Sequence, residues 1–523
     1  MARIPSAVLA AALLLLPLRS EGSEFWDAHY RAGDNARSLE LHRRLLIEGP
    51  HDGIAGLDED ASRAVWEEAH LRFILELTRE QRSYGEARAT LEGFLEKEHP
   101  PLLDALARQN LASYRWLLHD LAGARSTWRE LAFLTDWWII GSFENERGSG
   151  LSRRYPPEEG FDPDAVYRGK RHDVTWRRWS DPGRAGLVEL GSLLRPPEEA
   201  VAYLLTHLHA PEPTEAVLRI GSSGSYALWL NGREAARRDV ERRLHFDQDA
   251  VVVRLEEGWN RLLVKSGQTK GSWRFRARLS RRDGAPLAGI RILAALPEGA
   301  SLAEAGGPLP PQDAPLGAVT LLAEAEPSAE SLHLLGWLLR ARGAHDVTEH
   351  PDRGAHLRAL ELEPGSAVGE HLLARTYRRE ITHSAEREEN PWRQALERAL
   401  DLDPSFHRLR VELARYHLQR FANLTRAEEI LRPALASEEP PSAALDLQAK
   451  ILEARHGEAA AARLSRRLAE RLEGELLLPV RLREIDRARE EGRIEEAQSL
   501  VDAGLTHSPT SPSLLRPAPR GRG

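Results

Sequence analysis

The chain has 523 residues, a formal net charge of -8 at pH 7, 41% hydrophobic residues and no cysteine. The absence of cysteine excludes disulfides and any thiol nucleophile, so stability must come from buried apolar surface, which a chain of this length can provide in several domains. Acidic and basic residues are intermixed and the net charge is modest, which indicates neither nucleic acid nor an anionic membrane as a partner.

The first residues have the layout of a secretory signal peptide. Arg3 precedes an apolar run over residues 7–18, and small residues follow at Ser20 and Gly22. The run is shorter than the roughly 20 residues that cross a bilayer as a helix, and no other segment is long enough, so we expect no transmembrane segment after removal of residues 1–22. An exported chain without cysteine fits a bacterial envelope better than a eukaryotic extracellular space, and we predict a periplasmic or secreted protein.

Residues 23–135 are predicted to form N-terminal helical repeats. The dipeptide Ala87-Arg88 recurs as Ala124-Arg125, each time between segments of helical apolar periodicity. This recurrence predicts two or three helical hairpins.

Residues 136–290 follow a period of two, which is typical of β-strands. Between residues 226 and 235, alternating apolar side chains run into Asn231-Gly232, a strong hairpin signal because both turn positions need positive φ. Further strands are predicted at 137–143, 173–179, 200–209, 215–220, 250–255, 260–265 and 272–279. Many short strands separated by turns predict a β-sandwich.

Residues 291–317 are rich in proline, glycine and alanine and are predicted to be a linker, either flexible or packed as an extended segment. Residues 318–508 are predicted to form C-terminal helical repeats, because the segment 355–364 recurs in closely similar form at 395–404. Both copies carry apolar residues at helical spacing and close on a proline that stops the helix. The tail 509–523 is rich in proline, arginine and glycine and is predicted to be disordered.

Three parts of the chain resemble known families. The repeats resemble the tetratricopeptide repeat, whose signature closes on a small residue, an Ala-Leu pair and a proline. Residues 228–232 and 258–265 resemble framework strands and turns of the galactose-binding-like jelly roll, a sugar-binding module of glycosidases. Residues 138–145 resemble the start of this module in large exported bacterial tetratricopeptide proteins, with Ser142 where that family has proline.

These resemblances imply a multidomain fold in which all-α helical-repeat solenoid segments flank an all-β jelly-roll sandwich. Some of the similar proteins continue into a transglutaminase-like domain. Without a cysteine nucleophile, this polypeptide cannot carry that activity.

Five tryptophans of the predicted sandwich are candidate ligand contacts: Trp176, Trp179, Trp229, Trp259 and Trp273. An indole can cover the apolar face of a pyranose and still donate a hydrogen bond, whereas a tryptophan in a β-sandwich more often packs in the core. Trp176 and Trp179 lie three positions apart and should therefore face opposite sides of an extended strand.

Other candidate chemistry is weaker. His207 and His209 share a strand face and could chelate a metal, but zinc needs a third ligand and none is apparent. Asp247 and Asp249 could bind calcium in a loop, although a single Asp-x-Asp is common by chance. The segment 221–225 lacks the lysine and the helix of a phosphate loop, and it also lacks the nucleophile-elbow pattern. We predict no catalytic residue, no metal site and no cofactor.

The sequence therefore predicts a non-enzymatic, exported scaffold or adaptor that binds protein partners through its helical repeats. A carbohydrate-binding protein that acts through the sandwich is the first alternative. A non-catalytic part of a larger envelope enzyme is the second.

Overall fold

The computed structural model describes residues 25–26, 35–48, 53–81, 83–181, 186–304, 313–344, 350–377, 390–438, 440–471, 478–507 and 514. The predicted signal peptide and nearly all of the predicted tail lie outside these residues. The chain forms two compact units. One comprises Met1–Ser83, Ala325–His333 and His356–Gly523, and the other comprises Tyr84–Glu324 and Leu334–Ala355. Among the described residues, no helix combines the length and apolar character needed to cross a membrane.

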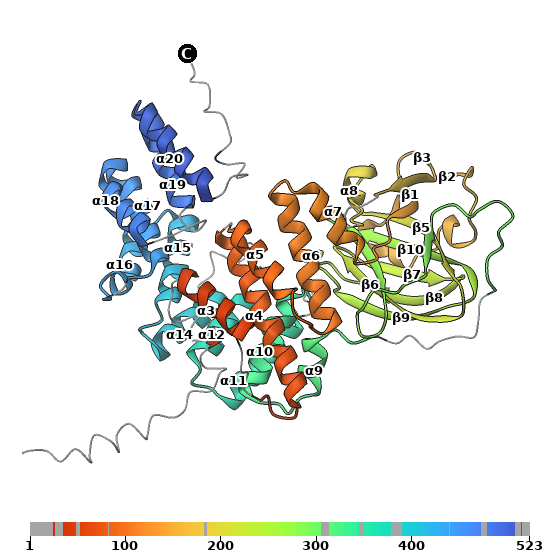
Figure 1. Ribbon diagram of the computed structural model, residues 1–523, viewed down its shortest axis with the longest axis horizontal. Coiled ribbons are helices and arrows are strands. Elements are labelled where there is room, and N and C mark those ends of the chain that lie inside the picture. Colours follow the sequence, from red (N-terminus) through yellow and green to blue (C-terminus); the bar gives the residue numbers. More distant parts are fainter. Residues whose placement is uncertain are drawn as a thin grey trace, which may run out of the picture. The chain divides into compact units, whose positions relative to one another are not determined.

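The first unit, hereafter the helical unit, consists of paired helices (Figure 1). Its helices are α3 (Asn35–Glu48), α4 (Glu59–Gln81), α12 (Ala367–Tyr377), α14 (Pro391–Leu402), α15 (His407–Phe421), α16 (Leu424–Leu435), α17 (Ser442–His456), α18 (Glu458–Arg471), α19 (Leu478–Glu490) and α20 (Ile494–His507). Helices α10 (Ala329–Ala341) and α11 (Pro351–Leu362) each contribute residues to both units. Packed pairs are α3 with α4, α12 with α14, α15 with α16, α17 with α18, and α19 with α20.

Helix α14 shows how the repeated segment folds. Asn390 caps its start, because the Oδ1 atom accepts hydrogen bonds from the amides of Trp392 and Arg393, and Pro391 occupies the first turn, where no amide donor is needed. The predicted apolar stripe is buried at Trp392, Ala395, Leu396 and Ala399. The buried positions are those that the sequence periodicity predicts.

Two histidine pairs are buried between helices of this unit. The Nδ1 atoms of His42 in α3 and His70 in α4 lie 2.9 Å apart, and those of His333 in α10 and His356 in α11 lie 3.2 Å apart. Burial lowers the pKa of His42 to about 3 and that of His333 to about 4, because an imidazolium loses its hydration there. His42 and His333 are therefore neutral near neutral pH.

The second unit, hereafter the sandwich unit, contains all the described strands (Figure 1). They are β1 (Asp136–Glu144), β2 (Val166–Arg168), β3 (Asp173–Thr175), β4 (Arg177–Ser180), β5 (Ala200–Ala210), β6 (Thr214–Ser222), β7 (Tyr226–Leu230), β8 (Arg233–Arg238), β9 (Asp249–Leu255), β10 (Gly258–Gln268), β11 (Phe275–Ser280) and β12 (Arg291–Leu293). Its helices are α5 (Tyr84–Phe94), α6 (Pro101–Leu117), α7 (Leu121–Arg129), α8 (Leu190–Leu193) and α9 (Ala318–Glu324). The predicted fold class, helical segments that flank an antiparallel β-structure, is confirmed.

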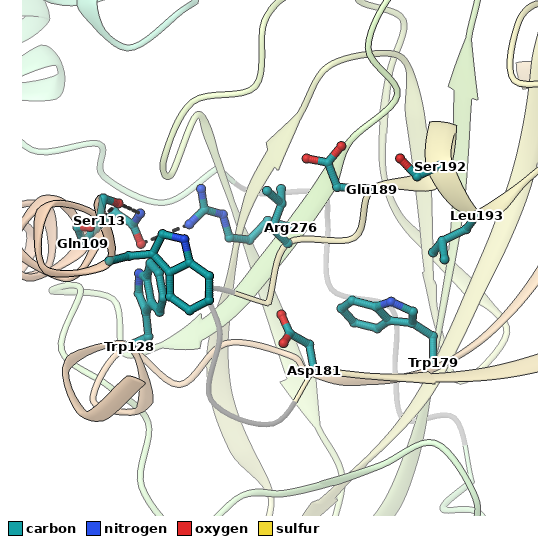
Figure 2. A pocket seen from close by; sticks show the side chains of 11 residues that line it. Gln109, Ser113, Trp128, Trp179, Asp181, Glu189, Ser192, Leu193 and Arg276 are labelled. Carbon is teal, nitrogen blue, oxygen red and sulfur yellow. Dashed lines mark hydrogen bonds between the residues drawn. The ribbon is translucent and has the colours of Figure 1, made fainter. Parts of the chain in front are cut away.

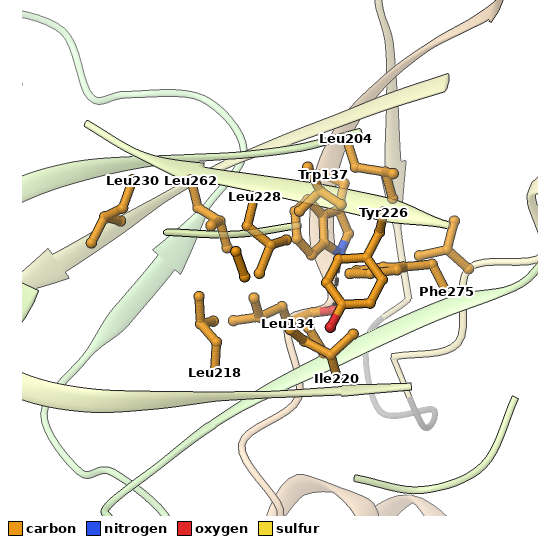
Figure 3. Packing of buried hydrophobic residues seen from close by; sticks show 14 of the residues in the cluster. Leu134, Trp137, Leu204, Leu218, Ile220, Tyr226, Leu228, Leu230, Leu262 and Phe275 are labelled. Carbon is orange, nitrogen blue, oxygen red and sulfur yellow. Dashed lines mark hydrogen bonds between the residues drawn. The ribbon is translucent and has the colours of Figure 1, made fainter. Parts of the chain in front are cut away.

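The strands form two main antiparallel sheets. The large sheet has seven strands in the order β4-β1-β5-β10-β7-β8, with β12 also paired to β5, and the small sheet has the order β11-β6-β9. Their inner faces share one core, in which Leu204, Leu228 and Leu262 of the large sheet meet Leu218 and Ile220 of the small sheet (Figure 3). This is the packing of a β-sandwich.

The predicted hairpin at Asn231-Gly232 is present. Both residues have positive φ, 49° and 81°, and they join β7 to β8. The primed turn matches the right-handed twist of the two strands, which is why Asn-Gly predicts it from local sequence alone.

Part of the predicted linker packs on the sandwich. Residues of β12 pair with His207–His209 of β5, and the amide of Ala303 donates to the carbonyl of Trp259. Farther along, the amide of Ala314 donates to the carbonyl of Ala250. The described parts of this segment therefore follow the packed, extended alternative.

The outer face of the small sheet carries three buried arginines, Arg219, Arg276 and Arg278, which we call the arginine face. Arg219 and Arg278 are direct partners across β6 and β11. The Nε and Nη2 atoms of Arg278 donate to the Asp247 carboxylate, at 2.7 Å from Nη2 to Oδ2, and both side chains are buried. Asp247 therefore neutralises a cation that would otherwise face another guanidinium in the protein interior.

The histidine pairs predict that stability falls in acid. An unfolded histidine takes up a proton near pH 6.5, whereas His42 and His333 stay neutral in the fold until about pH 3 and 4. The unfolded state therefore binds more protons below pH 6.5, and each histidine removes up to about 1.4 kcal/mol of stability per pH unit as the pH falls toward the folded pKa. Urea unfolding of His333→Gln should show a shallower loss between pH 6.5 and 4, while the exposed His172→Gln should not. Equal slopes in both variants would contradict this.

The arginine face predicts a strong dependence on Asp247. Asp247→Asn should lower the free energy of unfolding by about 3–5 kcal/mol, because the guanidinium of Arg278 would remain buried without its carboxylate. Asp173→Asn is the matched control, since its ion pair with Arg168 at 3.5 Å is exposed and should contribute less than about 1 kcal/mol. Denaturant unfolding followed by tryptophan fluorescence measures both, and similar losses would refute the assignment.

Candidate functional site

The five predicted tryptophans do not form one platform. Trp273 lies in the sandwich core, and its Nε1–H donates to Ser266 Oγ at 3.0 Å. Trp176 packs on the opposite, outer face of the large sheet, beside Ile140 and Tyr203. These two indoles are 1% and 5% exposed, so neither offers a face to a ligand.

The other three predicted tryptophans lie apart from one another. Trp259 is buried between the ring of His209, with centroids 5.0 Å apart, and the guanidinium of Arg291, 5.3 Å from the ring. Trp229 is half-buried on the outer face of the large sheet. Trp179, on β4, is half-buried and is the one of the five that lines the cavity described below.

The weaker metal candidates have protein partners. His207 is buried, with Nδ1 at 2.8 Å from the carbonyl oxygen of Ala294, and burial lowers its pKa. Asp249 accepts hydrogen bonds from Tyr226 and Arg242, and Asp247 pairs with Arg278. Within the described part of the chain, no group of three or more His, Cys, Asp or Glu side chains is placed to hold a metal ion.

A cavity of about 380 Å³ opens in the sandwich unit where α6 and α7 meet the β-structure (Figure 2). It is lined by Gln109, Ser113, Trp116, Trp128, Trp179, Asp181, Leu187, Glu189, Ser192, Leu193 and Arg276. Figure 2 shows Trp128 and Trp179 on opposite sides, with Asp181 and Arg276 between them. The site thus joins residues from two helices to residues from β4, β11 and the segment around α8.

The packing of α6 against α7 builds the aromatic wall. Small residues at Ala105, Ala112 and Ala124 let the two helices approach, and Trp128 completes this cluster. The rings of Trp116 and Trp128 have centroids 5.8 Å apart. Asp120 caps the start of helix α7, because its carboxylate accepts a hydrogen bond from the amide of Gly123. This cap fixes the start of the helix that carries Trp128.

Arg276 is the buried cation of the cavity. Its side chain comes from β11 on the arginine face, the residue is 8% exposed, and Nη1 donates to Gln109 Oε1 at 3.0 Å. Its guanidinium also lies 5.1 Å from the ring of Phe133. Burial lowers the pKa of Arg276 to about 10, and the carboxylate that acts against this is Asp247, which already pairs with Arg278.

The other polar side chains of the cavity include hydrogen-bond acceptors and groups that both donate and accept. Glu189 pairs with Arg274 at 3.0 Å, and Asp181 lies at the end of β4. Ser113 Oγ accepts from Gln109 Nε2 at 3.1 Å. No histidine lies among the described lining residues, so neither Ser113 nor Ser192 has an imidazole base beside it. Aromatic walls with donors and acceptors between them are suited to bind a hydroxylated ligand.

Sequence reasoning included Trp179 but missed the other lining residues. Trp116 and Trp128 lie in a segment predicted as a separate block of repeats, and nothing local indicates that it packs on the sandwich. One signal was available at and just before β11, where Arg274, Arg276 and Arg278 alternate with apolar residues. Three arginines on one strand face call for acceptors from another element.

No protein-family model matches the chain, and no curated protein matches it either. Among solved structures, a monomeric mutant of IFIT1 with Gppp-AAAA matches with a TM-score of 0.26 and 15% identity, over 38% of this chain and 48% of that one. The human IFIT1 dimer with PPP-AAAA matches with a TM-score of 0.25 and 16% identity, over 37% of this chain and 48% of that one. The matches thus span just under half of each IFIT1 chain. A likeness this slight supports no inference about this chain, and the bound molecules are those of the IFIT1 structures.

Proposed function

We propose that this chain is a non-enzymatic binding protein of the bacterial envelope that holds a carbohydrate in the cavity of its sandwich unit. The observation that carries this proposal is the composition of the cavity: three tryptophans around a set of hydrogen-bond donors and acceptors. Export rests on the predicted signal peptide. The absence of catalysis rests on the lack of a recognisable constellation in the sequence.

A pyranose matches such a cavity because its two parts need different surroundings. The ring has apolar C–H faces that an indole covers, and its rim has hydroxyls that both donate and accept. Trp128 and Trp179 supply two aromatic faces, while Arg276 donates and Asp181 accepts. The volume of about 380 Å³ lies at the lower end of the range of about 300–1,000 Å³ found for small-ligand pockets.

The glycan proposal predicts that glycan affinity depends on Trp179 and not on Trp229. Trp179→Ala should weaken glycan binding by about tenfold or more, because it removes one stacking face, equivalent to about 1.4 kcal/mol. Trp229→Ala is the matched control, since Trp229 is equally half-buried in the same unit but lies on the outer face of the large sheet. The full chain is first screened on immobilised glycans, and the hits are then titrated. Equal affinity of both variants would count against this cavity.

A second candidate function, protein binding through the helical repeats, is favoured by the surface of α18. Arg463, Arg466 and Arg467 are exposed at positions i, i+3 and i+4, and so share one helix face. No described carboxylate lies within ion-pair distance of them. On the neighbouring helices, by contrast, Arg455 pairs with Glu428 and Arg483 pairs with Asp446. An acidic polypeptide segment would supply the missing counter-charges, as a scaffold role requires.

This scaffold proposal predicts charge-dependent binding of an acidic peptide. The wild-type chain should bind a fluorescent polyglutamate peptide in low salt, and replacement of Arg463, Arg466 and Arg467 by glutamate should abolish binding, because attraction becomes repulsion. The control replaces three exposed arginines of the sandwich unit, Arg154, Arg168 and Arg254. Fluorescence anisotropy reports the affinity. Loss of binding in both triple variants would indicate a general charge effect and refute the α18 surface.

A further inference from the structure

Resting on the proposed carbohydrate site, we infer that the ligand is an acidic saccharide of the hexuronic acid class, whose carboxylate pairs with the guanidinium of Arg276. The ring would lie against the tryptophans, and the carboxylate would occupy the part of the cavity beside β11. Three observations support this: the unmatched charge of Arg276, the engagement of nearby carboxylates elsewhere, and the position of Arg276 among the aromatic walls.

Arg276 differs in its acceptors from Arg278, Arg242 and Arg219 of the sandwich unit. Arg278 and Arg242 each have a carboxylate partner, Asp247 and Asp249 respectively. Arg219 has three oxygen acceptors, at 2.8 to 3.1 Å. The one hydrogen bond of Arg276 to a described residue goes to the neutral amide of Gln109. A buried cation with a single neutral acceptor is unfavourable, and an anion placed beside it restores the balance.

Among the described residues, Asp247 and Glu189 are already engaged by other arginines. Asp247, whose charge raises the pKa of Arg276, is already shared with Arg278. Glu189 pairs with Arg274. A ligand carboxylate is therefore the matching group for Arg276, and a planar guanidinium can hold it through two parallel hydrogen bonds.

The same cavity disfavours a simple inorganic anion. A free phosphate would leave the faces of Trp128 and Trp179 uncovered, whereas a sugar ring between them buries its apolar C–H surface. Asp181 would repel a carboxylate placed next to it but would accept hydrogen bonds from ring hydroxyls. The cavity thus favours one orientation, with the acid group toward Arg276 and hydroxyls toward Asp181.

The test compares acidic sugars with their neutral counterparts on the full wild-type chain. Isothermal titration uses oligogalacturonate against oligogalactose and oligoglucuronate against oligoglucose. We expect at least one acidic member to bind about tenfold or more tightly than its neutral partner, as a charge-assisted pair implies. Arg276→Gln should reduce the acidic member to the affinity of the neutral one, and Arg276→Lys should retain part of the preference. Arg178→Gln, which removes a half-exposed arginine paired with Asp136, is the control and should retain the full preference.

The outcomes separate this inference from the function on which it rests. Equal affinity for acidic and neutral members in the wild type, with Trp179→Ala weakening both, would overturn the acid preference and leave the carbohydrate site standing. No binding of any sugar would remove both. An acid preference that survives in a folded Arg276→Gln variant would also overturn the assignment. If thermal unfolding shows that Arg276→Gln does not fold, the Arg276→Lys variant is used instead. An acid preference as large as that of the wild type in Arg276→Lys would contradict a bidentate pair.

Discussion

The burial of the arginine face is the constraint on which the arrangement of the sandwich unit depends. A guanidinium carries five donors and a permanent charge, so it can leave water only where acceptors are already in place. Arg278 finds Asp247 and the carbonyl of Gly284, and Arg219 finds Ser280 and carbonyls on either side. Arg342 binds the carbonyl of Asp247 as well, at 2.6 Å. Hydrogen bonds to buried arginines therefore fix three segments: the loop before β9, the turn after β11 and the segment after α10.

The helices α6 and α7 complete this arrangement and create the cavity at the same time. Gln109 of α6 reaches Arg276, while Trp128 of α7 stands beside it. An apolar sheet face could have been covered tightly by apolar side chains from the helices, with no space left over. Among the described residues, Arg276 has one hydrogen-bond acceptor, the neutral amide of Gln109, and the cavity opens beside it. Arg276 thus belongs both to the buried arginine face of the sheet and to the proposed binding site.

The two units offer different kinds of surface for recognition. The cavity of the sandwich unit is partly open, aromatic and small, which suits a compact hydroxylated ligand. The helical unit instead offers extended helix surfaces, on which α18 presents exposed arginines at helical spacing. The histidine pairs of this unit are buried between its helices. Under the two proposed functions, the chain would hold a glycan and a polypeptide by separate physical means.

Features that depend on neighbouring residues were determined by the sequence alone. The Asn231-Gly232 hairpin needs only positive φ at two positions, and the stripe of α14 needs only apolar residues at helical spacing before a proline. The alternation in β11 likewise fixes which side chains leave the core, but not what they meet. Only the tertiary structure decided that Arg276 is buried, that Trp116 and Trp128 come from helices to stand near it, and that Trp273 and Trp176 are packed away. These residues lie far apart in the chain and come together only because α6 and α7 cover this face of the sheet. No local sequence pattern specifies which element covers a given sheet face.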